Sequence, residues 1–294
     1  MRDITAEQKT LLNIGQISGL VESSVFGDCF RYSIAKLSFE LINRANLSEN
    51  SDIANLLSDS SEPEFTGRFV KLFLEPPRKN SCSERLREIH RQMFSHKEGF
   101  QSHPGEWADE TKAGQIDGVI DSLETDTSPF KTAIRLHEFV LKLQPFNDGN
   151  KRIAALAPNY YLQSTGLTPY PLFTFHNPPP IDEANQWFAE QSEKMVRILR
   201  GINRLGKTYA DRTNGLATQR KKLLTKLLPH MMRRPKFGIQ EILDDYGEGT
   251  FQTISLLAKE IKEPPINILE ETTGYSRFRV FNLHEYTKLF NELI

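Results

Sequence analysis

Apolar residues recur at helical spacing along most of the chain, and polar turns separate the runs. The run from Cys29 to Asn43 carries its apolar side chains on one broad face, and similar runs cover residues 65–74 and 83–94. Thr5, followed three residues later by Gln8, is typical of a helix start, because the two residues can cap each other. This pattern predicts a mainly α-helical protein.

Residues 95–129 lack this periodicity. They are rich in Gly, Ser, Asp, His and Thr, and Pro104-Gly105 is a turn signal. A long aperiodic stretch between helices is usually a functional loop. Helical spacing returns at residues 129–143 and again beyond residue 150, where Pro158 predicts a kink or a boundary.

The C-terminal part has a different pattern. A helix predicted from Ile181 to about Leu205 is followed by a polar interval, 206–218, where we place a domain boundary. Short helices and two strands are then predicted, with the helices at 223–232, 239–246 and 250–262 and the strands at 266–270 and 277–283. Three short helices followed by a hairpin are the arrangement of a winged-helix domain. We therefore expect an N-terminal helical region (1–80), a central helical domain (81–205) and a winged helix-turn-helix domain (206–294).

Composition narrows the class of protein. With a net charge of −1 over 294 residues, the chain as a whole has no attraction to nucleic acid or membrane, so any basic surface must be local. No apolar stretch approaches the roughly 20 residues of a membrane span, and the N-terminus lacks the apolar core of a signal peptide. Cys29 and Cys82 have no metal-binding spacing and are expected to be reduced thiols. We expect a cytoplasmic protein that does not enter a membrane.

The stretch at residues 143–152, Leu-Gln-Pro-Phe-Asn-Asp-Gly-Asn-Lys-Arg, interrupts two helical runs. A helix that begins there would present unpaired backbone N–H groups and the positive end of its dipole, which together favour an anion. Lys151 and Arg152 add positive charge at the same end. The sequence therefore predicts a phosphate-binding site.

The residues from Gln144 to Arg152 resemble the signature of the Fic/Doc (Fido) family, HxFx[D/E]GN[G/K]R. His137, seven residues earlier, the segment Leu86–His90 and the run Pro104-Gly105-Glu106-Trp107 resemble features of the same family. The likeness covers roughly residues 10–200 and implies a Fic-type helical bundle with a small β flap at Glu106 and Trp107. A winged helix is a common companion in bacterial members.

The family transfers part of a nucleotide, usually AMP from ATP, to a hydroxyl side chain of a target protein. The resemblance implies ATP or a related nucleotide with Mg²⁺ as cofactors and such a target protein as a partner. Asp148 would hold the Mg²⁺, a task that suits a carboxylate. The remaining loop residues would bind the nucleotide phosphates, namely Asn147, Gly149, Asn150, Lys151 and Arg152.

The motif departs from the family pattern at the catalytic position, where Gln144 replaces the His that acts as base. An amide side chain cannot accept a proton near neutral pH, and general-base assistance is worth about 10²–10⁴ in rate. The usual transfer is therefore expected to be impaired or lost. Lys151 gives the form similar to Doc, so a Doc-like phosphotransferase that moves the γ-phosphate stays an alternative.

Two further positions bear on regulation. Ser18 and Glu22 resemble the inhibitory [S/T]xxxE[G/N] helix of the family, and Ala155 stands where many members have an Arg that pairs with this Glu. His137 is interpreted as a packed core histidine. The spacing of His90, His96 and His103 fits no set of metal ligands.

The predicted winged helix gives a second alternative, a regulator that binds DNA or a protein through residues 216–294. Its third helix is not strongly basic, because Glu260 opposes Lys259 and Lys262, although Arg220-Lys221-Lys222 and the Arg277 and Arg279 pair add positive charge. The same domain could instead dock a second copy of the chain to form a homodimer.

Overall fold

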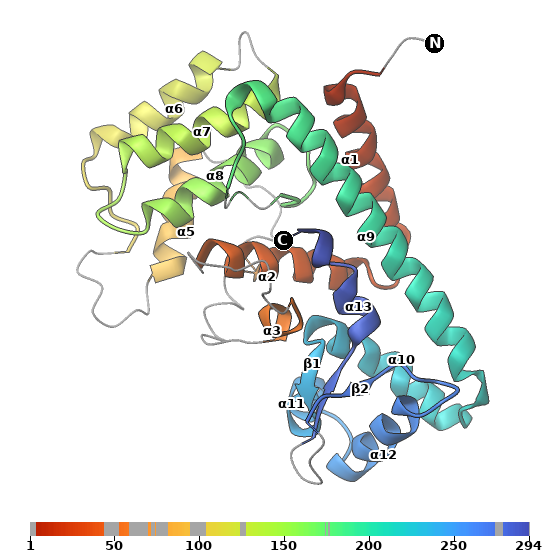
Figure 1. Ribbon diagram of the computed structural model, residues 1–294. Coiled ribbons are helices and arrows are strands. Elements are labelled where there is room, and N and C mark those ends of the chain that lie inside the picture. Colours follow the sequence, from red (N-terminus) through yellow and green to blue (C-terminus); the bar gives the residue numbers. More distant parts are fainter. Residues whose placement is uncertain are drawn as a thin grey trace. The chain divides into compact units, whose positions relative to one another are not determined.

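The computed structural model describes residues 4–43, 53–58, 70–71, 74, 82–94, 104–123, 128–173, 175, 177–273 and 279–293. It is mainly helical, with a small three-stranded sheet near the C-terminus (Figure 1). In chain order the elements are α1 (Ala6–Ser23), α2 (Gly27–Asn43), α3 (Ile53–Ser58), α5 (Cys82–Phe94), α6 (Thr111–Leu123), α7 (Pro129–Leu143), α8 (Asn150–Ser164), η1 (Ile181–Glu183), α9 (Ala184–Arg212), η2 (Thr213–Gly215), α10 (Thr218–Arg233), β1 (Lys236–Gly238), α11 (Ile239–Tyr246), α12 (Phe251–Lys262), β2 (Glu270–Glu271), β3 (Val280–Asn282), α13 (His284–Lys288) and η3 (Asn291–Leu293). None of the described helices is long and apolar enough to cross a membrane.

The chain divides into two compact units, and both are assembled from separate segments. The first unit contains residues 1–19, 34–46 and 61–196, and the second contains residues 20–33, 47–60 and 197–294. The polar interval at 206–218 was expected to separate domains, but α9 continues as helix through residue 212. Gly206 lies inside that helix because it packs closely on Phe26, where an added Cβ would lie 2.5 Å from a ring carbon.

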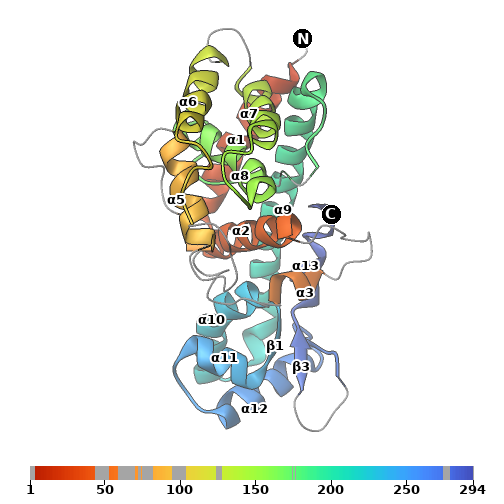
Figure 2. The same cartoon turned by 90° about the vertical axis from the view of Figure 1, so that its left-hand side faces the viewer.

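The first unit is built around the antiparallel pair α7 and α8, which lie side by side in both views (Figures 1 and 2). Residues 153–163 of α8 are all buried, so this helix forms the centre of the unit. Helix α5 packs against α8 and α6, and contributes Leu86 and Ile89 to the core. Burying such side chains stabilises a fold by about 1.5–3 kcal/mol each.

Several expected helices are confirmed. The predicted cap at the start of α1 is present, since the Gln8 N–H donates to Thr5 Oγ1 (3.2 Å) and the Thr5 N–H donates to Gln8 Oε1 (3.0 Å). Ser83 lies inside α5, and both its N–H and its hydroxyl donate to Asp117 of α6. The helix expected at 65–74 lies largely outside the described residues.

The stretch at 95–129 was expected to be a loop with a small β flap, and this expectation was wrong in part. Its described residues are 104–123 and 128–129, and they form a turn, α6 and the start of α7, with no strand among them. Helix α6 begins after Asp109, whose side-chain oxygen accepts the N–H of Thr111 (2.9 Å). Gly114 and Gly118 lie inside α6 and Ile116 is its one fully buried apolar residue among those described, so the periodic signal was weak.

The second unit contains α10 to α13 and the sheet, whose strand order is β1-β3-β2. Both pairings are antiparallel, with Phe237 opposite Phe281 and Glu271 opposite Phe281. The predicted helix at 239–246 is confirmed by α11, and Thr250 caps α12 by accepting the N–H of Thr253 (3.2 Å). The sequence did not predict β1, because three residues are too short to show an alternating pattern. Part of the second predicted strand, residues 277–278, lies outside the described residues.

Burial protects the Cys29 thiol in the second unit. The side chain is 2 % exposed, and burial raises its pKa to about 11. The thiol is therefore protonated and unreactive near neutral pH. The side chain of Cys82 lies outside the described part of the chain.

Candidate functional site

The loop between α7 and α8 is made by two residues with left-handed backbone conformation. Helix α7 ends where Gln144 adopts φ 46° and ψ 65°, and the Gln144 N–H still donates to Val140 O (3.1 Å). The following Pro145 disfavours a helical conformation at Gln144. At Gly149, φ is 74°, and a Cβ would lie 2.5 Å from the Phe94 ring. This position therefore accepts glycine alone without strain.

Helix α8 begins at Asn150 and presents an open N-terminus. Gly149 O accepts the N–H groups of Arg152 (3.0 Å) and Ile153 (3.1 Å). Within the described residues, no acceptor lies in hydrogen-bond range of the N–H groups of Asn150 and Lys151. Two free donors at the positive end of a helix make a site for an anion.

The Asn150 side chain closes this loop on itself. Its Nδ2 donates to Phe146 O (2.6 Å), and its Oδ1 accepts the Phe146 N–H (2.9 Å). Because both polar atoms are used in this way, Asn150 offers an anion its backbone N–H and fixes the loop with its side chain.

Polar and charged side chains lie near the N-terminus of α8, where the anion would bind. Lys151, Asn147 and Asp148 are exposed, and Arg152 is half-buried with its guanidinium carbon 5.5 Å from the centre of the Phe94 ring. Contact with an aromatic face restrains a guanidinium while it stays available to a phosphate. The two cations and the free N–H groups therefore lie at one end of one helix.

Asp148 is the candidate metal ligand. Its Oδ1 accepts the Gly149 N–H (2.6 Å), and its carboxylate is exposed. The described residues contain no group of three or more His, Cys, Asp and Glu side chains that could hold a metal ion. One exposed carboxylate fits Mg²⁺ in sites where phosphate oxygens and water supply the remaining ligands.

The loop is anchored by Phe146, whose ring stacks on two other rings. Phe146 is 2 % exposed and stacks on His90, with ring centres 4.0 Å apart and planes 7° from parallel. It also stacks on Trp107 at 4.7 Å and 17°. Trp107 was expected in the flap, and the structure places it as a buried packing residue, whereas Glu106 is exposed.

His90 connects two segments that are far apart in the sequence. Its Nδ1 accepts the Gly105 N–H (2.8 Å), so Nε2 carries the proton and donates to Asp148 O (3.0 Å). Burial lowers the pKa of His90 to about 4, against a smaller opposing effect of this hydrogen bond. His90 is therefore neutral at physiological pH. The sequence pattern assigns His90 no role, and only its place in the Leu86–His90 resemblance pointed to it.

Residues at the start of α6 and just before it hydrogen-bond to the loop. The Ala108 N–H donates to Pro145 O (2.8 Å), and Lys112 Nζ donates to Gln144 O (2.8 Å). These contacts use backbone atoms of the loop and leave the Gln144 side chain exposed. The backbone of residue 144 is thus held in place while its side chain stays exposed.

His137 has a structural partner. Pro158 lies inside α8 and has no N–H, so the carbonyl of Ala154, four residues earlier, lacks its helical donor. His137 Nδ1 lies 2.9 Å from this oxygen and donates to it. Burial lowers the pKa of His137, although the hydrogen bond opposes the shift. Of the two alternatives expected at Pro158, a boundary is not found, because α8 continues through it, and a kink stays a prediction.

The possible inhibitory residues lie on α1. Ser18 Oγ donates to Ile14 O (3.0 Å) in the same helix, and Glu22 is exposed and belongs to the second unit. Ala155 is buried, at 4 % exposure. The pairing of Ser18 and Glu22 as an inhibitory motif stays a prediction.

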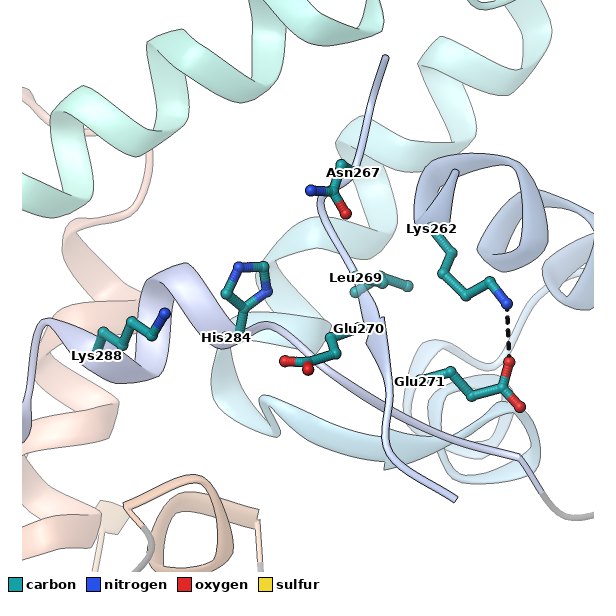
Figure 3. Close-up of a pocket in the computed structure, with 7 residues that line it drawn as sticks. All are labelled: Lys262, Asn267, Leu269, Glu270, Glu271, His284 and Lys288. Atoms are coloured by element: carbon teal, nitrogen blue, oxygen red, sulfur yellow. Dashed lines mark hydrogen bonds and ion pairs between the residues drawn. The ribbon is translucent and has the colours of Figure 1, made fainter. Parts of the chain in front are cut away.

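A separate cavity of about 470 Å³ lies in the second unit (Figure 3). Its lining includes side chains of both charges, among them Lys262, Glu271, His284 and Lys288. Lys262 Nζ donates to Glu271 Oε2 (3.0 Å), which neutralises both groups. None of the predicted nucleotide-site residues lines it.

Comparison with known proteins identifies the segment that carries the loop. The sequence model of the Fic/DOC family matches residues 80–162, from before α5 to near the end of α8. No curated protein matches the chain. Residues 80–162 are therefore similar to the Fic/DOC family, which is associated with AMPylation.

Two solved structures resemble the whole chain weakly. One is a Fic family protein from Desulfovibrio desulfuricans G20, with 14 % identity over 94 % of this chain and 95 % of that chain and a TM-score of 0.39. The other is a Fic domain containing signaling protein from Bacteroides thetaiotaomicron VPI-5482, with 17 % identity over 83 % of this chain and 97 % of that chain and a TM-score of 0.38.

Proposed function

We propose that this chain, whose residues 80–162 are similar to the Fic/DOC family, binds ATP or a related nucleotide together with Mg²⁺ at the loop from Gln144 to Arg152. We further propose that AMP transfer to the hydroxyl of a target protein is weak or lost. The observation that carries the nucleotide site is the open N-terminus of α8, with its free N–H groups at Asn150 and Lys151.

The loop is preorganised for phosphate. Gly149 and the closed ring of bonds between Asn150 and Phe146 fix the backbone, so little ordering entropy is lost when an anion binds. Lys151 and Arg152 would neutralise phosphate charge, with the guanidinium forming forked hydrogen bonds. Mg²⁺ would be held by Asp148 and would supply charge neutralisation of the phosphates.

Gln144 is the reason for weak transfer. Its amide can donate a hydrogen bond to a hydroxyl and orient it, but cannot accept the proton that the attacking oxygen must lose. The backbone there is left-handed, a conformation in which His is enriched among non-glycine residues. A His at residue 144 would therefore fit the loop without rearrangement.

The nucleotide site is tested by calorimetry with Mg²⁺ and ATP. Asp148→Asn keeps an oxygen that can accept the Gly149 N–H and removes the charge, so Mg²⁺-dependent binding should fall while the loop stays folded. Glu138→Gln, an exposed carboxylate change on α7, is the matched control and should bind as the parent does. Failure of the parent chain to bind any nucleotide would refute the site.

The transfer step is tested with ATP labelled at the α- or the γ-phosphate, Mg²⁺ and host lysate. We expect little labelling by the parent chain and more by Gln144→His. Strong labelling from the α-phosphate by the parent would overturn the proposed loss of activity. Labelling from the γ-phosphate alone would support the Doc-like phosphotransferase, which Lys151 favours.

A second candidate function is that of a regulator that binds DNA or a protein through residues 216–294. The order α10-β1-α11-α12-β2-β3 with a β1-β3-β2 sheet is the arrangement that a winged helix requires, and it supports this candidate. A gel shift of DNA by the full chain that is lost with changes in α12 would favour it. A gel shift that is unaffected by changes in α12 would count against recognition of DNA by this helix.

A further inference from the structure

The C-terminal part of α9 carries a strip of positive charge. Arg197, Arg200, Arg204 and Lys207 are all exposed. At 3.6 residues per turn, these four positions fall within about 80° of one helix face. No Asp or Glu occurs from residue 194 to residue 210. We call these four residues the α9 basic face.

The surrounding sequence reinforces this charge. Residues 197–236 contain twelve Lys and Arg and one acid, Asp211, in a chain whose net charge is −1. Some of these cations have partners, as Arg212 pairs with Glu285 and Arg220 with Glu260. For Arg204 and Lys207, no carboxylate within ion-pair distance is found in the described part of the chain. Arg204 and Lys207 therefore carry the available charge of this face.

We propose that the α9 basic face binds the phosphate backbone of a nucleic acid duplex without reading its sequence. Three of the four cations are Arg, whose planar fork matches phosphate oxygens. From residue 197 to residue 207 the helix rises about 15 Å. A duplex carries on the order of nine phosphate charges over that length, so a straight helix face meets several at once.

An anionic membrane fits this face less well. Helices that bind membrane surfaces combine cations with large apolar side chains that enter the lipid. The exposed large apolar residues in the described ranges are Ile4, Leu11, Leu12, Val25, Phe251 and Leu256. None of them is on α9, so the α9 basic face offers charge without an apolar edge.

The helix that reads DNA in a winged-helix domain would be α12, and its surface is of another kind. Phe251 is 52 % exposed and Leu256 is 50 % exposed. Lys262 is engaged by Glu271 (3.0 Å), which leaves Lys259 as the exposed cation of this helix. The α9 basic face thus carries more positive charge for a phosphate backbone than α12 does.

The proposal is tested with the full chain and a fluorescent DNA duplex of about 25 base pairs, by anisotropy over a range of salt. If three to four phosphates are neutralised, the logarithm of the association constant should fall with the logarithm of salt with a slope of about −3 to −4. The double variant Arg204→Gln/Lys207→Gln should make the slope shallower by about 2. Its affinity at low salt should fall at least about tenfold.

The matched control is Lys142→Gln/Lys259→Gln, which removes two exposed cations elsewhere, including the one on α12. This variant should keep the slope of the parent. Equal weakening by both double variants would overturn the assignment to α9, and so would a greater loss in the control. No binding by the parent chain at low salt would overturn the proposal itself.

Two further measurements separate charge from side-chain shape and a duplex from a lipid surface. Arg204→Lys/Lys207→Arg preserves the charge and should keep the salt slope, so loss of binding in this variant would count against an electrostatic face. If vesicles with about 30 % phosphatidylserine bind through Arg204 and Lys207 while DNA does not, the partner is a lipid surface and the proposal fails. Because ATP binding by the variants should be unchanged, failure here is distinct from failure of the nucleotide site.

Discussion

The hydrogen bond between His137 and Ala154 O gives a quantitative prediction about how α8 tolerates Pro158. The oxygen is buried, and His137, 6 % exposed, is its donor at 2.9 Å. His137→Phe would keep a ring of similar size and remove the donor. A buried carbonyl left unsatisfied costs about 1–3 kcal/mol, so the free energy of unfolding should fall by that amount.

Pro158→Ala supplies a second donor to the same oxygen. With an N–H at residue 158, the normal helical hydrogen bond to Ala154 O can form. In this background His137→Phe should cost much less than in the parent chain. We therefore expect a coupling free energy of about 1–2 kcal/mol, in the sense that the double variant is more stable than the two single changes predict.

The assay is native-state hydrogen exchange of peptides from α7 and α8, read by mass spectrometry. A local measurement is preferred, because a chain of two compact units need not unfold in one step. His137→Asn, whose amide nitrogen lies close to the position of Nδ1, is the control and should cost less than His137→Phe. If His137→Phe costs the same in the parent chain as in the Pro158→Ala background, to within about 0.5 kcal/mol, the proposed role of the histidine is refuted.

Three other predictions concern the loop and its support. Burial holds the pKa of His90 at about 4 in the folded chain, whereas it is near 6.5 in the unfolded chain. The free energy of unfolding should therefore fall by up to about 3 kcal/mol as the pH drops from about 6.5 to 4, and should not depend on His90 above pH 6.5. His90→Gln should remove this pH dependence in urea titrations at several pH values. Gly149→Ala should destabilise the chain by about 1–3 kcal/mol more than Gly166→Ala in thermal unfolding. Both glycines have a φ of +74°, but only a Cβ at residue 149 would meet the Phe94 ring. Equal costs of the two changes would contradict this reasoning. Gln144→Gly should stabilise the chain by about 1 kcal/mol in the same assay by relieving the left-handed backbone, and a loss of stability would instead show that the Gln144 side chain has a structural contact.

Several contacts of the candidate site could not be predicted from the sequence. His90 and Asp148 are 58 positions apart, and the bond from Nε2 to the Asp148 carbonyl exists only once α5 packs on α8. Trp107 and Phe146 are joined in the same way, by stacking across a long stretch of chain. Periodicity and capping signals depend on residues within about four positions of each other, so they carry no information about such contacts.

The sequence by itself determined what local rules control. Helical spacing placed α2, α7, α8 and α11, the Thr5 and Gln8 pair marked the start of α1, and the motif from Gln144 to Arg152 identified the phosphate-site candidate. Only the tertiary structure decided that Asn150 uses its side chain to close the loop, that α6 is a helix with one fully buried apolar residue among those described, and that His137 replaces the donor Pro158 lacks. The reason is physical: spacing and capping act within one turn of helix, whereas burial and the pairing of buried polar groups are properties of the packed chain.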